Sequence, residues 1–165
     1  VCWVLDICNA KVNDSCGFHV HMDAASFNLD TWKNLALTYK HLEHLIDAFM
    51  PRTRRNNTYC KTLSGVSDER IKSVRTIDGL REVFNNDRYH KVNFEAYSRH
   101  RTVEFRQHSG TTNFTKMENW IRFLNGLITF AKRSSLPSRM TLEGLPFLDG
   151  KQKLFFKLRT KKLAA

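Results

Sequence analysis

Two short alternating stretches carry the side chains best suited to chemistry. His19 and His21 are separated by one apolar residue, and so are Glu104 and Arg106. Residues two apart in a β-strand point to the same face, so each pair would project together. Imidazoles and a carboxylate can hold a metal ion, and a guanidinium can bind a carboxylate or phosphate through two hydrogen bonds.

Each pattern also has a common alternative. An isolated pair of histidines on a strand is more often a surface feature than a binding site, because the motif is so short. A glutamate beside an arginine is most often a cross-strand ion pair. Taken one at a time, the two stretches therefore leave both interpretations open.

A third group of polar residues lies in a cationic loop over 52–64. Loops frequently carry binding residues, so an anion site is one interpretation and a solvated basic loop is equally good. Arg88, Lys91 and Asn93 belong with this group, since Lys91 and Asn93 would share one face of a strand. The loop residues concerned are Arg52, Arg54, Arg55, Asn57, Tyr59 and Lys61.

The elements that must position these residues predict an α+β fold, with a mostly antiparallel sheet and helices on one face. Strands are expected over Gly17–Asp23, Tyr89–Tyr97 and Thr102–Gln107, with a turn near Ser98–Arg101. Residues 1–10 fit either a helix end or a buried strand.

Helices are expected from a cap at Asn28 or Asp30 to about Met50, over Ser67–Val74 and Thr76–Phe84, and from a Thr115/Glu118 capping box to about Arg133. Pro51 would end the first of these. Residues 151–165 fit a final helix or a fraying tail. His41 and His44 are assigned to the solvated face of the long helix.

The composition limits the class of protein. The 165 residues are 41% hydrophobic, which suits one domain over 1–165. The net charge of +11 favours anionic partners. No apolar stretch approaches membrane-spanning length, so we expect no membrane partner. Four cysteines without a pairing pattern favour reduced thiols and a cytoplasmic location.

Taken in order, the motifs resemble the amidoligase family, which are carboxylate–amine ligases with a glutamine-synthetase-like fold. The specific pieces are Gly-x-His-x-His from Gly17 and Thr-Val-Glu-Phe-Arg from Thr102. Between them lie the loop after Pro51 and the segment Arg88–Asn93. The resemblance covers roughly residues 14 to 133.

This resemblance implies an ATP-dependent ligase that forms an amide through an acyl phosphate, with Mg²⁺ or Mn²⁺. It implies that His19 and Glu104 ligate the metal ion, and that Glu104 and Arg106 are catalytic. The nucleotide would contact His21, Arg54 and Arg55. The substrates, a small-molecule or peptide carboxylate and an amine, would contact Asn57, Tyr59, Lys61, Arg88 and Asn93.

The sequence departs from this family in one respect. Enzymes of this fold class hold their metal ions with several carboxylates on strands before the HxH strand, but here only Asp6 and Asp14 precede His19. We therefore expect either the C-terminal part of a catalytic domain or a degenerate relative, with an incomplete fold and no activity on its own. Two other functions stay open: a basic nucleic-acid-binding module, and a metal-dependent hydrolase or nuclease that uses His19, His21 and Glu104.

Overall fold

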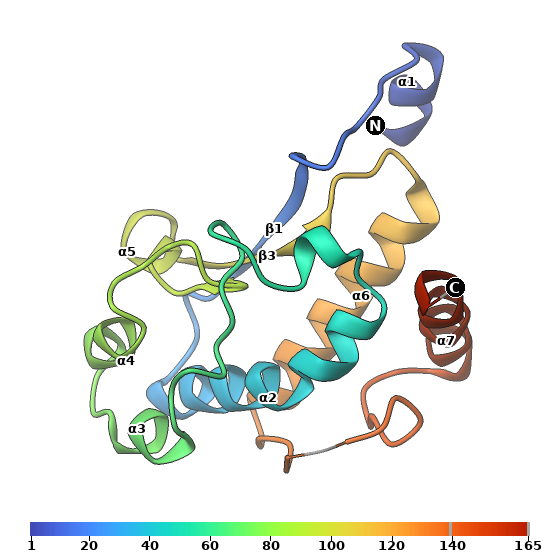
Figure 1. The fold of residues 1–165 in the computed structure, drawn as a ribbon. Coiled ribbons are helices and arrows are strands. Elements are labelled where there is room, and N and C mark those ends of the chain that lie inside the picture. The colour runs from blue at the N-terminus through green and yellow to red at the C-terminus, as the bar shows by residue number, and fades with distance from the viewer. Residues whose placement is uncertain (139, 165) are drawn as a thin grey trace.

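The computed structural model describes residues 1–138 and 140–164 and contains a three-stranded antiparallel sheet. Strand β3 (Thr102–Ser109) is central, with β1 (Gly17–Asp23) on one side and β2 (Val92–Asn93) on the other. Helices α2 and α6 lie along one side of this sheet (Figure 1). The predicted α+β class is confirmed.

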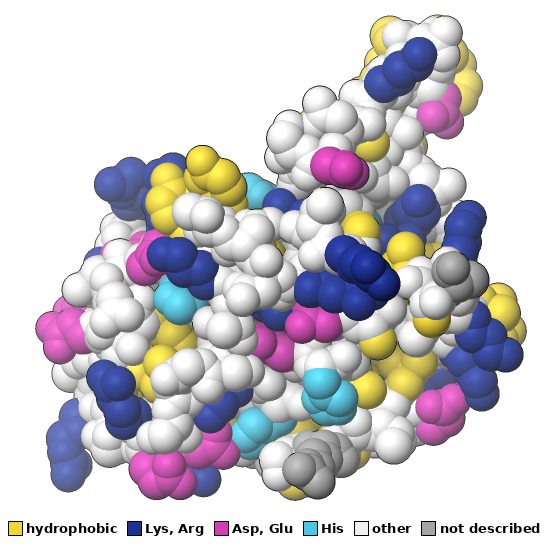
Figure 2. All heavy atoms as spheres, in the orientation of Figure 1, with side chains coloured by type: hydrophobic (Ala, Val, Ile, Leu, Met, Phe, Trp, Pro, Cys, Tyr) yellow, Lys and Arg dark blue, Asp and Glu magenta, His cyan; other side chains and the backbone are white. Residues whose placement is uncertain are grey.

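The helices of the described residues are short except for three. Helix α1 projects at one end of the molecule (Figure 1, and the protruding lobe in Figure 2), where Cys2 contacts Met117 of α6 at 3.4 Å, and α7 lies beside α6. The described segments 1–138 and 140–164 contain no helix long and apolar enough to cross a membrane. The bounds are α1 Cys2–Ile7, α2 Leu29–Ala48, α3 Asp68–Ser73, α4 Ile77–Val83, α5 Ala96–His100, α6 Phe114–Ala131 and α7 Gly150–Ala164, with a 3-10 turn η1 at Arg52–Arg54.

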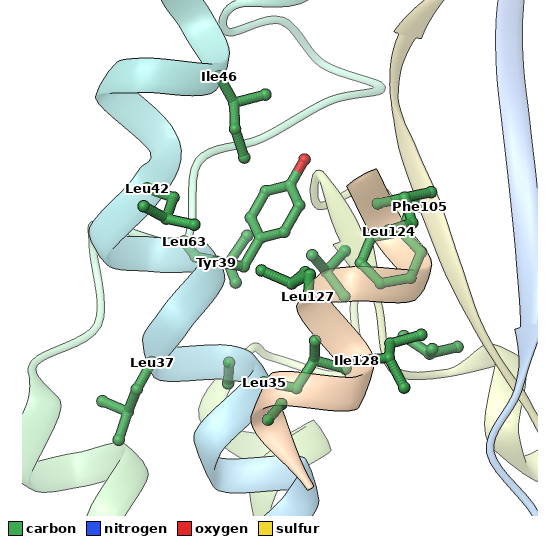
Figure 3. Close-up of a cluster of buried hydrophobic side chains, with 14 of the residues drawn as sticks. Leu35, Leu37, Tyr39, Leu42, Ile46, Leu63, Phe105, Leu124, Leu127 and Ile128 are labelled. Carbon is green, nitrogen blue, oxygen red and sulfur yellow. The ribbon is translucent and has the colours of Figure 1, made fainter. Parts of the chain in front are cut away.

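The core forms where the predicted apolar stripe of α2 meets α6 and the sheet (Figure 3). The Tyr39 ring lies 5.8 Å from the ring of Phe105 on β3. The helix begins where predicted, because the Asn28 side chain accepts a hydrogen bond from the backbone N–H of Thr31 at 2.8 Å. Pro51 follows its end. Buried side chains of α2 and α6 include Trp32, Leu35, Leu42, Ile46, Leu124 and Leu127.

The two short helices are also confirmed, and each has a side-chain cap. The hydroxyl of Ser67 accepts the backbone N–H of Arg70 at 3.3 Å before α3. The hydroxyl of Thr76 accepts the backbone N–H of Gly79 at 3.0 Å before α4. These caps satisfy N–H groups that the first helical turn leaves without partners.

The predicted strand over Tyr89–Tyr97 is wrong in its extent. Only Val92 and Asn93 pair with β3, and helix α5 replaces the expected turn near Ser98–Arg101. Aromatic packing outweighs the alternating pattern here. The ring of Trp32 packs against the rings of Phe94 and Tyr97, with centroid distances of 6.1 Å and 5.1 Å.

The capping box proposed for α6 is also wrong. The helix is capped by Asn113, whose side chain accepts the backbone N–H of Lys116 at 3.0 Å. Asn is at least as good a cap as Thr. Thr115 is therefore inside the helix, and Glu118 pairs with Arg122 at 2.9 Å.

His41 departs from the predicted solvated face of α2. Its two ring nitrogens lie 2.8 Å from a carboxylate oxygen of Asp68 and 2.7 Å from the carbonyl oxygen of Leu136. This histidine therefore connects α2 to α3 and to the segment after α6. Only His44 is exposed as expected.

Candidate functional site

A β-bulge sets the arrangement of the site. Phe18 pairs with His108 and Val20 pairs with Phe105, so β1 advances two residues while β3 advances three. The extra residue re-aims the side chains of β3. His19 of β1 lies across from the bulged part of β3, which is Arg106 and Gln107.

The predicted convergence of the two alternating stretches is confirmed. The carboxylate oxygen Oε1 of Glu104 lies 3.0 Å from Nδ1 of His19 and 3.8 Å from Nε2 of His21. The same oxygen accepts a hydrogen bond from Nη1 of Arg106 at 2.8 Å. The other oxygen accepts one from the side-chain amide of Asn93 at 2.6 Å. Four side chains from all three strands therefore surround one carboxylate.

Glu104 is ionised in this setting. Burial by itself raises the pKa of the carboxyl, but hydrogen bonds from His19 and Asn93 and the positive charge of Arg106 act more strongly in the opposite direction. The pKa is lowered to about 2. At neutral pH the site therefore contains a negative charge that is already partly compensated.

A pocket of about 420 Å³ opens over this carboxylate. Its floor consists of Asn93, Glu104 and Arg106, which are all buried. We call these three residues the pocket floor. Five exposed residues of the lining are here called the pocket rim: Asn86, Arg88, Ser98, Arg99 and His100.

Sequence reasoning missed most of the rim. It included Arg88, but Ser98–His100 was assigned to a turn between two strands. Their local signal is weak, because α5 is only five residues long. The pocket rim therefore adds positive charge to the site that the two alternating stretches did not predict.

Arg54 and Arg55 lie outside the pocket lining. Arg54 is buried, and its guanidinium donates to the carbonyl oxygens of Arg106 and Gln107 in the bulge. Arg55 donates to the carbonyl oxygen of Met50 at 3.0 Å. These bonds hold the polypeptide backbone. The prediction that both arginines contact a nucleotide gains no support from their positions.

Of the other predicted loop residues, Asn57 and Lys61 bond away from the pocket, and Tyr59 contacts its floor. Asn57 bonds within its own loop, to the backbone of Thr53 and Tyr59, and Lys61 forms an ion pair with Asp87 at 2.6 Å. Tyr59, by contrast, reaches the site. Its carbonyl oxygen accepts a hydrogen bond from Nε of Arg106 at 3.4 Å.

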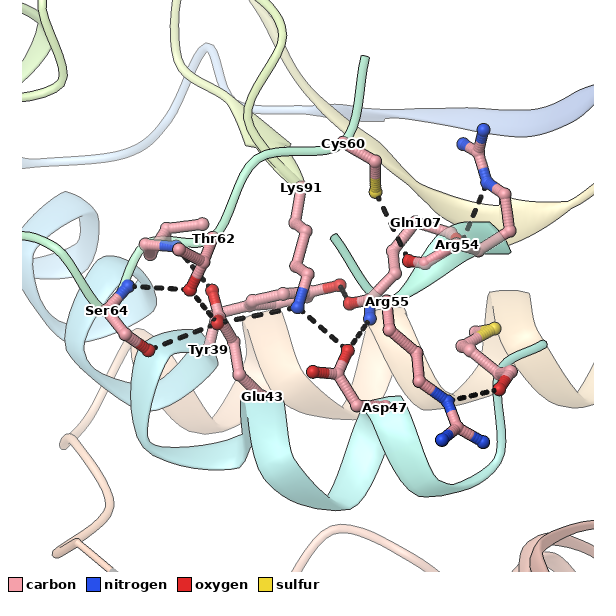
Figure 4. Close-up of polar contacts among 12 residues, drawn as sticks. Tyr39, Glu43, Asp47, Arg54, Arg55, Cys60, Thr62, Ser64, Lys91 and Gln107 are labelled. Atoms are coloured by element: carbon pink, nitrogen blue, oxygen red, sulfur yellow. Dashed lines mark hydrogen bonds and ion pairs between the residues drawn. The ribbon is translucent and has the colours of Figure 1, made fainter. Parts of the chain in front are cut away.

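Lys91 and Asn93 do not share a face, contrary to the prediction. Asn93 binds Glu104, whereas Lys91 points to α2, where its ammonium lies 2.8 Å from Asp47 and 3.5 Å from Glu43 (Figure 4). Lys91 precedes the two-residue strand β2, so strict alternation does not extend to it.

A buried polar network lies beneath the bulge (Figure 4). The hydroxyl of Tyr39 donates to the side-chain oxygen of Gln107 at 2.6 Å, and the amide of Gln107 donates to Asp47. The backbone N–H of Arg106 donates to the carbonyl oxygen of Lys91 at 2.9 Å. The segment Arg106–Gln107 of β3 is therefore held by Tyr39 and Asp47 of α2 and by the backbone of Lys91.

The side chains in the site do not form a complete metal site by themselves. Within residues 1–138 and 140–164, no group of three or more His, Cys, Asp or Glu side chains is placed to hold an ion. Asp23 is turned toward the backbone N–H of Ala25, at 3.2 Å. The Arg106 guanidinium occupies one side of Glu104. His19 and Glu104 could supply two ligands to an ion that brings others with it.

Comparison with known proteins gives one match. A family model described as "Putative amidoligase enzyme" matches residues 4–128. This range contains every residue of the pocket floor and pocket rim and ends within α6. No curated protein and no solved structure matches the chain.

Proposed function

The chain belongs to the amidoligase family, whose members are ligase-type enzymes, and we propose that it is an ATP-dependent carboxylate–amine ligase. The observation that carries this proposal is the convergence of His19, His21 and Arg106 on the buried carboxylate of Glu104. This constellation lies at the bottom of a pocket large enough for small molecules. We further propose that the chain is a single domain that forms part of a glutamine-synthetase-like catalytic fold.

The proposed reaction has two steps. A carboxylate reacts poorly with amines, so its oxygen first attacks the γ-phosphorus of ATP, and ADP leaves. The amine nitrogen then attacks the carbonyl carbon of the acyl phosphate, inorganic phosphate leaves, and the amine loses a proton. In such reactions the protein chiefly positions the reactants and balances charge.

Arg106 is the residue best placed for that work. Its guanidinium lies on the pocket floor, held by Glu104 at 2.8 Å and by the carbonyl oxygen of Tyr59 at 3.4 Å. A guanidinium fixed in this way needs little rearrangement when negative charge develops on a phosphoryl group. Asn93 fixes the other carboxylate oxygen, so the floor behaves as one hydrogen-bonded unit.

We propose that Mg²⁺ or Mn²⁺ enters with the nucleotide as metal–ATP. Phosphate oxygens are hard ligands that suit these ions, and His19 and Glu104 would add protein ligands. Bound there, the ion would neutralise phosphate charge. His21, exposed on the same face, would lie beside the phosphates.

The two alternative functions gain less support. A nucleic-acid-binding module accounts for the net charge of +11, but not for a buried carboxylate surrounded by two imidazoles and a guanidinium. A metal-dependent hydrolase would use the same two imidazoles and Glu104, but it does not account for the Arg106 guanidinium that donates to this carboxylate at 2.8 Å.

The test is release of ADP and phosphate from ATP in the presence of a panel of carboxylates and amines. It uses the full natural protein. Glu104→Gln should lower turnover by roughly 100-fold or more, while Glu118→Gln on the surface of α6 should not. Turnover that is indifferent to Glu104→Gln would refute the assignment.

A further inference from the structure

The pocket rim is built from two segments that sequence reasoning did not bring together. Asn86 and Arg88 follow α4, where Asn85 and Asn86 adopt the left-handed conformation that Asn tolerates. Ser98, Arg99 and His100 form the end of α5. The ring of His100 lies edge-on to that of His21 at 5.8 Å, and Nε2 of His21 lies 3.8 Å from Glu104 of the floor.

The charges that line the pocket do not balance. Two ion pairs in the lining are electrically neutral: Arg106–Glu104 of the floor and Arg81–Glu95. Arg88 and Arg99 of the rim also line the pocket, and the described part of the chain gives neither of them an acidic partner. Two guanidiniums therefore remain uncompensated, next to an imidazole, an amide and a hydroxyl.

The rim cations differ from other exposed arginines nearby. Arg101, on the same turn as Arg99, lies over the ring of Tyr97 at 4.5 Å and is not part of the pocket lining. Arg88 lies over the ring of Tyr89 at 5.0 Å, yet it still lines the pocket. Arginine recognises carboxylate and phosphate groups through paired hydrogen bonds. The rim thus has the composition of an anion-binding site.

We propose that the rim binds a second anionic group of the substrate, so that the carboxylate substrate is an acid with two negatively charged groups, in the simplest case a dicarboxylic acid. This inference rests on the proposed ligase function. One carboxylate would lie on the floor beside Arg106, where it is activated. The other would lie between Arg88 and Arg99 and would select acids of the right length.

The test compares acids of matched length by calorimetry at fixed ionic strength. Glutarate and adipate are titrated into the protein beside pentanoate and hexanoate, which lack the second carboxylate. At least one dicarboxylate should bind on the order of tenfold more tightly than its monocarboxylate, the effect expected of charge-assisted hydrogen bonds. Arg88→Gln and Arg99→Gln should each reduce this preference, and Arg101→Gln should leave it intact.

Two results would overturn the inference. One is equal binding of the mono- and dicarboxylates. The other is a preference that survives both rim substitutions. A parallel titration with MgATP separates this inference from the ligase proposal. Loss of MgATP binding in Arg88→Gln and Arg99→Gln, with acid binding unchanged, would assign the rim to the nucleotide instead. Failure of the wild-type protein to bind MgATP would contradict the ligase proposal while leaving the comparison of acids interpretable.

Discussion

Replacing Lys91 by Met should destabilise the fold by about 3 kcal/mol at neutral pH. The side chain is only 1% exposed, and its ammonium is shared between Asp47 and Glu43. Met retains most of the apolar stem but leaves both carboxylates without their cation. Removal of one member of a buried ion pair costs about 3–5 kcal/mol. We expect the lower end because Glu43 keeps hydrogen bonds from Thr62 and Ser64.

The effect should depend on pH in a defined direction. Burial raises the pKa of Asp47, and Lys91 opposes that rise. Without Lys91 the pKa of the folded carboxyl should rise further. The folded variant then binds a proton that the unfolded chain does not, so its stability increases as the pH falls. The deficit relative to wild type should therefore shrink between pH 7 and the unfolded pKa of Asp, near about 4.

The assay is urea unfolding followed by tryptophan fluorescence at pH 7 and pH 5. Lys157→Met serves as the matched control, because the Lys157–Glu143 pair is more than half exposed on both sides. The control should lose clearly less stability than Lys91→Met, because solvent screens an exposed ion pair. If Lys91→Met lost no more than this control, or its deficit grew at pH 5, the reasoning about the buried network would be refuted.

Three further predictions concern the fold around the site. Because the pKa of Glu104 is lowered in the folded state, its ionised form stabilises the fold at pH values above the ordinary pKa of 4.5, and this stabilisation is lost as the pH falls toward about 2. The stability of Glu104→Gln should therefore fall less steeply with decreasing pH in this range. Asn113→Ala should cost about 1 kcal/mol in urea unfolding, whereas Thr115→Ala should change the stability by less than about 0.5 kcal/mol. Gly110→Ala should lower the melting temperature, because its Cβ would lie 2.5 Å from the Cβ of Cys16.

Local patterns predicted the elements whose ends carry strong signals. Asn28 before an apolar stripe and Pro51 after it set the bounds of α2, and strict alternation set β1. The same alternation placed His19 with His21 on one strand face, and Glu104 with Arg106 on another. That the two pairs meet was implied by the family resemblance, because periodicity determines a side chain's face but not which strands are neighbours.

What the sequence did not reveal depends on contacts between distant segments. Arg54 and Lys91 were grouped with the cationic loop, for which an anion site and a solvated surface were both open, but Arg54 binds carbonyl oxygens of the bulge and Lys91 binds carboxylates of α2. Trp32 turns the second half of a predicted strand into α5 by packing against Tyr97. That helix supplies Ser98, Arg99 and His100 to the pocket rim.

The most direct test of the proposed function is the affinity for ATP, with Mg²⁺ and with EDTA, of the wild-type protein and of Glu104→Gln. If Glu104 and His19 ligate an ion brought by ATP, wild type should bind MgATP more tightly than free ATP, and Glu104→Gln should abolish this difference. If Glu104 only balances Arg106, the substitution should instead free a cation and strengthen the binding of ATP without metal. That second result, or no ATP binding by the wild-type protein, would contradict the account.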